Sequence, residues 1–507
     1  MKSLRSGEYA KKIFVFIITF FLSAVSFTPV ARSESEIEII KRNMEMLQRQ
    51  MELLRQKLET LEKKSKQREK AVRSIIEEKK ERDALLEKKK AKPVIAFWKN
   101  DFILSTPDES FWMKIRGNLH FDSKFYDGGS KNPTEFDVRR ARMDFQGAFY
   151  KYIRFRIQAE FADSPYIRNA WADYKFRDWL HLRAGQMKPP FSTAWWTLDN
   201  RVNFIERGAN TPLYPYFDRG WWLWGDVFNH TLTWNVGAFT GAGMELDEKK
   251  GEIDDHKDYI GRLFWSPFVN KEGSLLEGLH LCLEGTLGRE SVPTKRFEKK
   301  GFGAGIRDDK FWTWATGDNA EIDHRNRLGA ELHYIHGPFS FSTEYLKVFY
   351  KGIKVYAPDG TKVIDDDGRI TSWSTWVSYF LTGERKSVSN FGWKQPAPKQ
   401  NFDPVNLKGK GAWEILFRYT MTDASRSLFD TYNYGGNSYT ILKGSHYVNE
   451  FTVGLSWTWN PMVRWQFNYI YLDGNGFGIR SGDREHPAGI EWRGSESMFG
   501  MRMIFKY

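Results

Sequence analysis

Basic side chains recur at alternate positions in several segments of the first half of the chain. The set comprises Lys114, Arg116, Arg140, Arg142, Arg154, Arg156 and Arg183. Residues two apart share one face of a β-strand, because successive side chains leave opposite faces of the pleat. Guanidinium groups offer paired donors to carboxylate and phosphate oxygens. Their spacing therefore predicts a basic surface on neighbouring strands that attracts anions.

Segment 112–122 shows the kind of element that positions the first pair. One parity carries the apolar residues Met113, Ile115, Leu119 and Phe121, and the other carries Lys114, Arg116, Asn118, His120 and Asp122. A period of two predicts a strand, and the sharp division predicts that one face contacts lipid and the other water. The same alternation places Met143 and Phe155 outward, with Arg142 and Arg156 inward.

Segments with this alternation continue to the end of the chain. We expect strands near residues 112–122, 137–150, 153–162, 166–176, 180–186, 220–226, 231–240, 258–265, 279–288, 325–336, 338–349, 371–382, 412–420, 447–459, 462–472 and 497–507. Their number, about sixteen, is even, as in single-chain bacterial barrels. The connections alternate between long and tight, but the link at 163–165 is short and the turn at 383–411 is long, which leaves the count open by two. The prediction is an all-β, transmembrane antiparallel β-barrel.

The composition supports a barrel and argues against nucleic acid as a partner. Aromatic residues make up 16% of the 507 residues although 28% are charged, and barrels need aromatic girdles at both lipid interfaces. The net charge is +12, but the basic residues of the barrel alternate along strands instead of forming one basic helix or arm. The last strand carries an outward row that resembles the signal read by the outer-membrane assembly machinery: Phe499, Met501, Met503, Phe505 and Tyr507.

The amino-terminal segment predicts export. Four basic residues precede an apolar run at 13–27, and Ala31, Arg32 and Ser33 give a small-x-small cleavage pattern. We therefore expect a signal peptide at residues 1–33, with an uncleaved anchor helix as the alternative. Export together with barrel strands predicts the outer membrane of a Gram-negative bacterium, with membrane lipid around the barrel.

Residues 34–92 predict an α-helical coiled coil. Apolar residues alternate at spacings of three and four: Ile37, Ile40, Met44, Leu47, Met51, Leu54, Leu58 and Leu61. A seam of about four heptads needs partner helices, so we expect an oligomerising stalk in the periplasm. The alternative is a helix that folds back or stays partly disordered. Residues 93–111 would then link the stalk to a barrel domain at 112–507.

The sequence offers no recognisable catalytic group. Asp144, Glu160 and Asp173 share the inward surface, where they should hold the arginines in place and keep anion binding weak enough for release. The single Cys282 excludes an intramolecular disulfide. His333 and His336 lie three apart on a strand, hence on opposite faces, and cannot share a metal ion. We expect no enzyme activity, no metal and no cofactor.

Several motifs between residues 112 and 507 resemble the phosphate-selective porin O and P family. They are FDVRRARMDFQGAF (136–149), IQAEFAD (157–163), NAWADYKF (169–176), LRAGQMKPPFS (182–192), FIERG (204–208), YFLTGE (379–384) and GAWEILFRY (411–419). The GQ-x-K-x-PFS and LTGE pieces are the more specific ones. The resemblance implies a homotrimeric outer-membrane channel of about sixteen strands per chain, whose third loop folds inward to form the constriction.

The resemblance places the third loop at about residues 186–219. This loop carries Lys188, Arg201, Arg207 and Arg219, with the acids Asp199, Glu206 and Asp218. Family-like anion contacts would fall on Arg140, Arg142, Arg154, Arg156 and Lys188. The function expected is passive diffusion of small hydrophilic solutes through a basic pore, with a preference for anions such as phosphate.

The aromatic content of this loop leaves a second solute class open. Tryptophans occur at Trp195, Trp196, Trp221, Trp222 and Trp224. An aromatic track would suit sugar rings or flat organic anions. The alternative is that these tryptophans belong to the lipid girdle and to loop packing. A further possibility is a structural barrel that tethers the envelope through its coiled coil.

Overall fold

The computed structural model describes residues 93–98, 101–126, 134–162, 165–241, 255–289, 302–303, 310–314, 320–482 and 487–507, with residues 45, 49, 52, 70 and 73–80 of the amino-terminal part. The chain divides into two compact units, Met1–Pro93 and Val94–Tyr507. Residues 45, 49, 52, 70 and 73–80 are helical and exposed. The predicted signal peptide and most of the predicted coiled coil lie outside the described residues. None of the helices described has the length and hydropathy of a membrane span.

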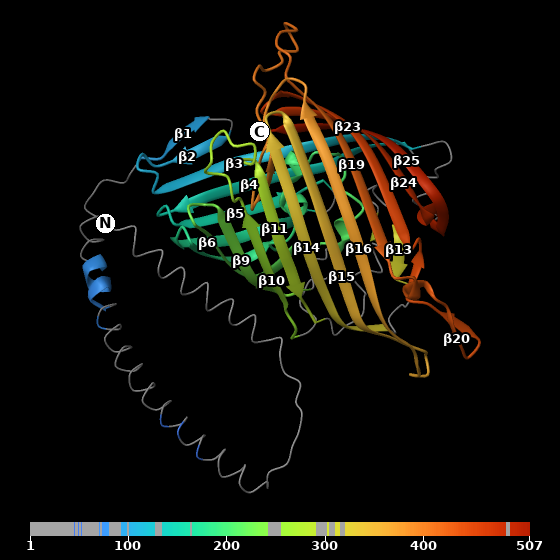
Figure 1. Cartoon of the computed structure of the whole chain (residues 1–507). Helices are drawn as coiled ribbons and strands as arrows, with labels where there is room; N and C mark the ends of the chain where they lie inside the picture. Colours follow the sequence, from blue (N-terminus) through green and yellow to red (C-terminus); the bar gives the residue numbers. More distant parts are fainter. Residues whose placement is uncertain are drawn as a thin grey trace. The chain divides into compact units, whose positions relative to one another are not determined.

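Long antiparallel strands dominate the second unit. Sixteen of them form its wall: β3 (Phe111–Tyr126), β4 (Glu135–Phe149), β5 (Ile153–Glu160), β6 (Tyr166–Arg177), β7 (Leu180–Met187), β8 (Asp218–Val227), β9 (Leu232–Phe239), β10 (Asp258–Trp265), β11 (Leu279–Leu287), β14 (Ala320–His336), β15 (Phe339–Tyr356), β16 (Lys362–Phe380), β19 (Ala412–Ala424), β23 (Tyr447–Asn460), β24 (Val463–Gly482) and β25 (Pro487–Lys506). Each pairs with the next in this order, and β25 pairs with β3 to close the barrel (Figure 1). Every predicted strand falls on one of these sixteen, so the predicted barrel is confirmed.

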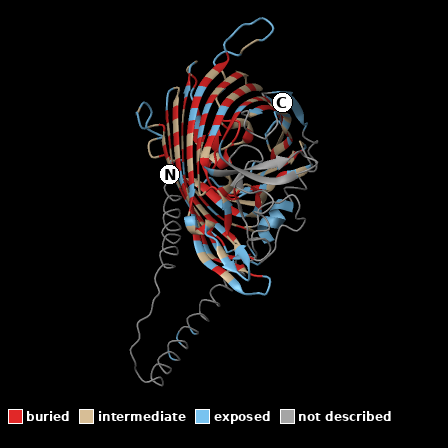
Figure 2. Ribbon diagram, turned by 90° about the vertical axis from the view of Figure 1, so that its right-hand side faces the viewer, coloured by how far each residue is buried: buried red, intermediate tan, exposed pale blue. Residues whose placement is uncertain are grey.

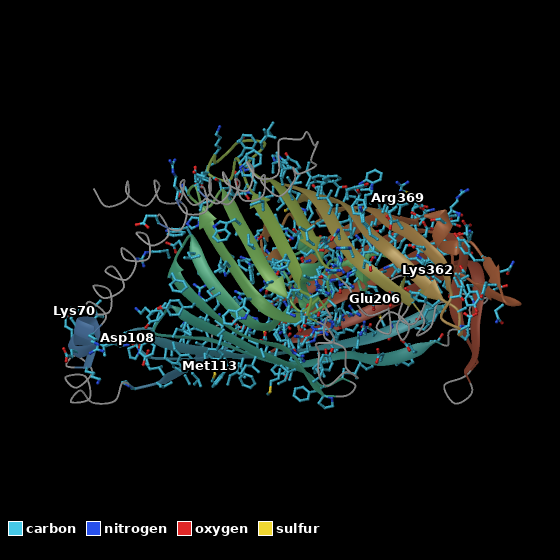
Figure 3. All side chains as sticks on the ribbon, turned by 90° about the horizontal axis from the view of Figure 1, so that it is seen from below. Lys70, Asp108, Met113, Glu206, Lys362 and Arg369 are labelled. Carbon is cyan, nitrogen blue, oxygen red and sulfur yellow. The ribbon has the colours of Figure 1, made fainter. Side chains whose placement is uncertain are left out.

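The barrel has two ends, which we distinguish by the direction of β3. The proximal end is where β3 begins and β25 ends, and the distal end is the opposite one. Asp108, in the turn before β3, and Lys362, at the start of β16, lie at opposite ends (Figure 3). At the distal end β16 begins at Lys362, well before the predicted residue 371. Its first residues are largely charged, so they lack the apolar alternation on which the prediction depended.

Burial alternates along the wall strands as the two-residue period predicts (Figure 2). Arg142 is 5% exposed whereas its neighbour Met143 is 38% exposed. Glu206, from a loop, lies inside the barrel, and Met113 lies on its outer side (Figure 3). The outer surface is therefore apolar, because it contacts lipid, and the inner face around Arg142 and Glu206 is polar. Toward the distal end the inner face also carries buried apolar residues, among them Val348, Ile353 and Ile470.

Shorter strands extend both ends of the barrel. At the proximal end β1 (Ile95–Trp98) pairs with β2 (Phe102–Ser105), which pairs in turn with β3, inside the segment expected to be a linker. At the distal end β12 (Phe302–Gly303) pairs with β13 (Lys310–Trp314), which pairs with β22 (Leu442–Gly444). The next pair, β20 (Tyr432–Tyr434) with β21 (Asn437–Tyr439), follows the short helix η3 (Arg426–Phe429).

The barrel closes through a contact between its first and last wall segments. The Gly117 N–H donates to the Tyr507 carbonyl at 2.7 Å, and the Tyr507 N–H donates to the Gly117 carbonyl at 3.2 Å. A Cβ atom on residue 117 would lie 2.1 Å from Cζ of Tyr507. Glycine is therefore required at this point for the terminal tyrosine ring to lie across β3.

Candidate functional site

The third loop, residues 188–217, crosses the lumen instead of covering the distal mouth. It contains the short helices α3 (Thr193–Trp196), η1 (Asp199–Arg201) and η2 (Thr211–Leu213) and appears as the green segment within the barrel (Figure 1). Its first turn is bound to acidic residues of the wall. The Ser192 N–H donates to Glu284 on β11 at 3.0 Å, and the Thr193 N–H donates to Glu331 on β14 at 3.0 Å.

A buried arginine completes this attachment. Arg262 on β10 lies 2.7 Å from Glu284 and 3.1 Å from Glu331, and all three side chains are almost fully buried. The Arg262 guanidinium also donates to the Thr193 hydroxyl at 2.6 Å. Removal of either carboxylate would leave a buried charge without its partner, which is strongly unfavourable. The two glutamates therefore serve to hold the loop.

The second half of the loop is held by the wall farther along the barrel. The Ile205 N–H donates to the Asn468 side chain on β24 at 2.6 Å, and the Ala209 N–H donates to Glu450 on β23 at 2.7 Å. The Tyr214 hydroxyl donates to Glu344 on β15. Because these bonds come from several strands, they hold the loop in place as a constriction. They also satisfy the backbone N–H groups named above, which lie away from bulk water.

Asp199 of the third loop lies among four arginines. Arg142 and Arg207 donate hydrogen bonds to its carboxylate, the latter at 2.5 Å, and Arg140 and Arg168 lie 3.6 and 3.7 Å away. Burial alone would raise the pKa of the Asp199 carboxyl, but these cations, led by Arg207 and Arg142, hold the pKa well below its usual range. Asp199 therefore stays ionised and neutralises part of the arginine surface.

A hairpin from the proximal end meets the third loop inside the lumen. It lies in the connection 381–411 and contains β17 (Ser387–Ser389) and β18 (Gly392–Lys394). The Trp393 N–H donates to the Thr197 hydroxyl at 2.9 Å, and the Phe391 ring stacks on Trp196 with centroids 5.4 Å apart. The constriction therefore has two parts, whereas the sequence analysis identified only the third loop and noted the length of this turn as an anomaly.

A cavity of about 490 Å³ lies between this constriction and the first strands of the barrel. Its basic lining comprises Arg116, Arg142, Arg156, Arg168, Arg183, Lys188, Arg201 and Lys506, and its acidic lining comprises Asp101, Asp144 and Asp199. The lining thus has eight basic and three acidic side chains. Such an imbalance in a confined space creates a positive potential that favours anions.

Most of these cations already pair with acidic side chains. The sequence analysis expected the inward-facing acids to hold the arginines in this way. Arg156 makes two hydrogen bonds of 2.9 Å with Asp144, Arg142 lies 2.6 Å from Glu160, and Arg183 lies 2.9 Å from Asp173. Lys188 donates to the Trp195 carbonyl at 2.6 Å. These groups contribute charge to the cavity, but much of their hydrogen-bonding capacity is used by the protein.

Arg201 and Lys506 differ from the other cations of the cavity. Within the part of the chain that the structure describes, neither side chain forms an ion pair with a carboxylate. Burial, together with the nearby charges of Arg116 and Arg156, lowers the pKa of Arg201. A cation surrounded by other cations gains most from an incoming anion. These two side chains are therefore the best placed to contact a solute directly.

The structure brings six of the eleven predicted site residues to this cavity: Arg116, Arg142, Arg156, Arg183, Lys188 and Arg201. Lys114 pairs with Asp101 at 3.0 Å, and Arg140 is buried beside Asp199. Arg154 is exposed near the proximal end of β5. Arg207 lines a smaller space between the third loop and the opposite wall.

The prediction that Arg219 lines the pore is corrected by the position of this residue on β8. Arg219 is exposed and shares its parity with Trp221, which is 62% exposed on the outer surface. Its guanidinium bonds to Gln186 at 3.2 Å. The lumen-facing parity of this strand belongs to Trp222 and Trp224, so Arg219 cannot contact a solute in the cavity.

Two basic lining residues were missed by the sequence analysis, for different reasons. Arg168 lies at a register shift where Gln158 pairs with Asn169 and Ala159 pairs with Ile167, so simple alternation does not predict its direction. Lys506 shares its parity with the buried Arg502 and Ile504. The two-residue rule would have found Lys506 had it been applied to the basic residues of the last strand.

Solved outer-membrane structures are similar to this chain. OmpT of Vibrio cholerae has 12% identity over 78% of this chain and 98% of its own, with a TM-score of 0.45. An anion-selective porin from Comamonas acidovorans has 9% identity over 78% and 100%, with a TM-score of 0.43. The outer membrane channel DcaP of Acinetobacter baumannii has 8% identity over 80% and 99%, with a TM-score of 0.46. No curated protein matches the chain.

The sequence profile described as phosphate-selective porin O and P matches residues 113–507. This range contains the whole barrel except the first two residues of β3, together with both parts of the constriction. The chain therefore belongs to the phosphate-selective porin O and P family.

Proposed function

We propose that this porin favours anions, phosphate among them, during passive diffusion of small hydrophilic solutes across the outer membrane. The observation that carries the proposal is the excess of basic over acidic side chains in the cavity, where Arg201 and Lys506 have no carboxylate partner among the residues that the structure describes. A permeating anion would exchange water for guanidinium and ammonium donors there. A cation would meet a repulsive potential.

Fast passage also requires weak binding, and the acids of the cavity supply this. Asp144 and Asp199 compete with a solute for the nearest arginines, because each already accepts hydrogen bonds from them. Conduction needs binding sites that are favourable to enter and easy to leave. We infer hopping of anions between partly neutralised arginines, with no chemical step and no energy source.

We infer a homotrimer whose coiled coil, residues 34–92, lies in the periplasm after removal of residues 1–33. The heptad seam of the stalk supports oligomerisation, since a lone helix would expose its apolar stripe. The barrel domain would follow from residue 112, with its proximal end toward the periplasm. Folding of this barrel would involve the outer-membrane assembly machinery.

Reversal potentials in planar bilayers under a salt gradient test the anion preference. Wild-type porin should favour chloride over potassium, and phosphate should carry current. The double variant Arg201→Gln, Lys506→Gln should lose about half of this preference or more, because it removes the unpaired cations. Arg219→Gln is the matched control, since Arg219 lies on the outer surface. Cation selectivity of the wild type would refute the proposal.

A further inference from the structure

Aromatic side chains share the cavity with the arginines, and only two of the tryptophans singled out from the sequence are among them, Trp196 and Trp222. Trp195, Trp196, Trp222 and Trp224 are almost fully buried, and Trp221 faces outward. Four of these five tryptophans therefore pack inside the protein, and the fifth lies on its outer surface. Phe391 and Trp171 also line the cavity, and they are less buried than Trp196 and Trp222.

Phe391 stands at the tip of the proximal hairpin, where it is held firmly. One face of its ring stacks on Trp196 at an interplanar angle of 7°, and its edge meets Trp224 with centroids 5.0 Å apart. The side chain nevertheless remains 41% exposed. Exposure of a large apolar side chain to the water of the lumen is unfavourable, and a solute that covers the side chain removes this cost. The fixed ring is therefore an apolar platform that a solute in the cavity can contact.

The second aromatic group of the cavity is combined with a cation. The Arg183 guanidinium lies 3.9 Å from the ring centroid of Trp171 and 4.5 Å from that of Trp222. It also lies 5.9 Å from the Phe391 ring centroid. Arg183 is thus fixed beside the platform by aromatic faces and by Asp173. An apolar surface and a positive charge are presented to the same space.

The size of the cavity matches this mixed lining. Pockets that bind small organic molecules have volumes of roughly 300–1,000 Å³ and combine apolar walls with a few placed polar groups. The cavity of about 490 Å³ lies in that range, and Met187, Leu198 and Met462 add apolar surface to it. An inorganic anion would use the charge but would leave the aromatic faces in contact with water.

The geometry points to aromatic carboxylates as the solute class that this cavity binds best, an inference that rests on the proposed anion preference. The ring would stack on the exposed part of Phe391. The carboxylate would meet Arg201 and Lys506 within the same cavity, since neither has a carboxylate partner in the described part of the chain. Neutral sugars fit less well, because they would leave the excess positive charge without a counterion.

Blockade of the chloride current by small carboxylates tests this inference on the full-length porin in planar bilayers. The probes are benzoate, cyclohexanecarboxylate and acetate at equal ionic strength. Benzoate should halve the current at a concentration about 10-fold lower than acetate, with cyclohexanecarboxylate between them. In Phe391→Ala the ratio of the acetate to the benzoate half-blocking concentration should fall to about 2.

Two further variants separate ring stacking from general changes of the constriction. Phe391→Leu keeps apolar bulk, so benzoate should lose its advantage over cyclohexanecarboxylate. Phe402→Ala removes the same side chain from the same connection, but Phe402 packs on Trp457 and Trp459 and does not line the cavity. This control should retain the wild-type ratio.

The possible outcomes distinguish this inference from the proposed function. Equal block by benzoate and acetate in an anion-selective wild type would overturn the aromatic solute class and leave the anion preference standing. An unchanged ratio in Phe391→Ala would overturn the role of the platform. Cation selectivity of the wild type would overturn both.

Discussion

Asp199 in the third loop is ion-paired with Arg142 on β4. The pair joins the constriction to the basic wall, and Glu160 on β5 contacts the same guanidinium at 2.6 Å. Arg142 was expected to contact anions, but its donors are largely used by these two carboxylates. The third loop therefore determines how much of the positive charge of the arginines remains available to a solute. This relationship makes Asp199 a position at which selectivity and loop stability should change together.

Replacement of Asp199 by Asn should raise the anion-to-cation permeability ratio about twofold and lower the stability of the docked loop. The ratio rises because Arg142 and Arg207 lose a neutralising charge. Stability falls, by about 3 kcal/mol, because buried guanidinium groups lose an ionic partner. Reversal potentials and the midpoint of thermal unfolding measure the two effects. Asp430→Asn, in an exposed loop after η3, is the control, and an unchanged ratio in Asp199→Asn would contradict the argument.

Acid should leave the contacts of Glu206 in the third loop intact until the pH is well below neutrality. Glu206 lies 3.5 Å from both Arg139 and Arg502. Burial raises the pKa of Glu206, but these arginines outweigh burial and lower the pKa to about 2. A carboxyl whose folded pKa lies below its unfolded value of about 4.3 stabilises the fold above that value and loses this contribution as the pH falls toward 2.

The part of conductance and selectivity that depends on Glu206 should therefore be constant between pH 7 and about pH 5 and should change only between about pH 4 and pH 2. Single-channel recordings over this range measure both quantities. Glu206→Gln should remove part of the acid transition, because it has no proton to gain. A selectivity change centred between pH 5 and pH 7 would show that another group controls the loop.

Alternation alone predicted the wall of the barrel, because lipid and water impose opposite demands on successive residues. Phe155 and Arg156 illustrate how few residues are needed, since adjacent side chains assign both faces of β5. Boundaries were less accurate at the distal end, where β16 continues into charged residues outside the expected apolar band. There the run of Asp365, Asp366 and Asp367 interrupts the alternation, so the periodic signal vanishes although the strand pairing continues.

The lumen could not be predicted to the same depth, because its contacts join residues distant in sequence. The bond from Thr193 to Glu331 and the stacking of Phe391 on Trp196 have no local pattern. Inward parity correctly placed Arg116 and Arg156, but it does not reveal which arginines are neutralised. That depends on Asp199, whose position is set by the path of the loop.

Closure of the barrel should depend on the absence of a side chain at residue 117. Gly117→Ala would place a Cβ atom against the Tyr507 ring and should cost about 1–3 kcal/mol of stability. On electrophoresis without boiling, the band of the folded barrel should then disappear at a lower temperature than in the wild type. Gly261→Ala on β10 is a matched control, because a Cβ atom there meets nothing within 4 Å. Equal effects of the two substitutions would show that strand propensity, not the seam contact, is responsible.

The proximal hairpin should limit conductance. Phe391 and Trp393 extend from it into the lumen and contact Trp196 and Thr197 of the third loop. Replacement of residues 387–394 by two glycines should raise single-channel conductance about twofold, because it removes side chains that narrow the path, while Lys386 can keep its ion pair with Glu414. Shortening the exposed hairpin β20–β21 in the same way is the control and should leave conductance unchanged. Conductance equal to that of the wild type after the first replacement would mean that the third loop alone sets the width of the pore.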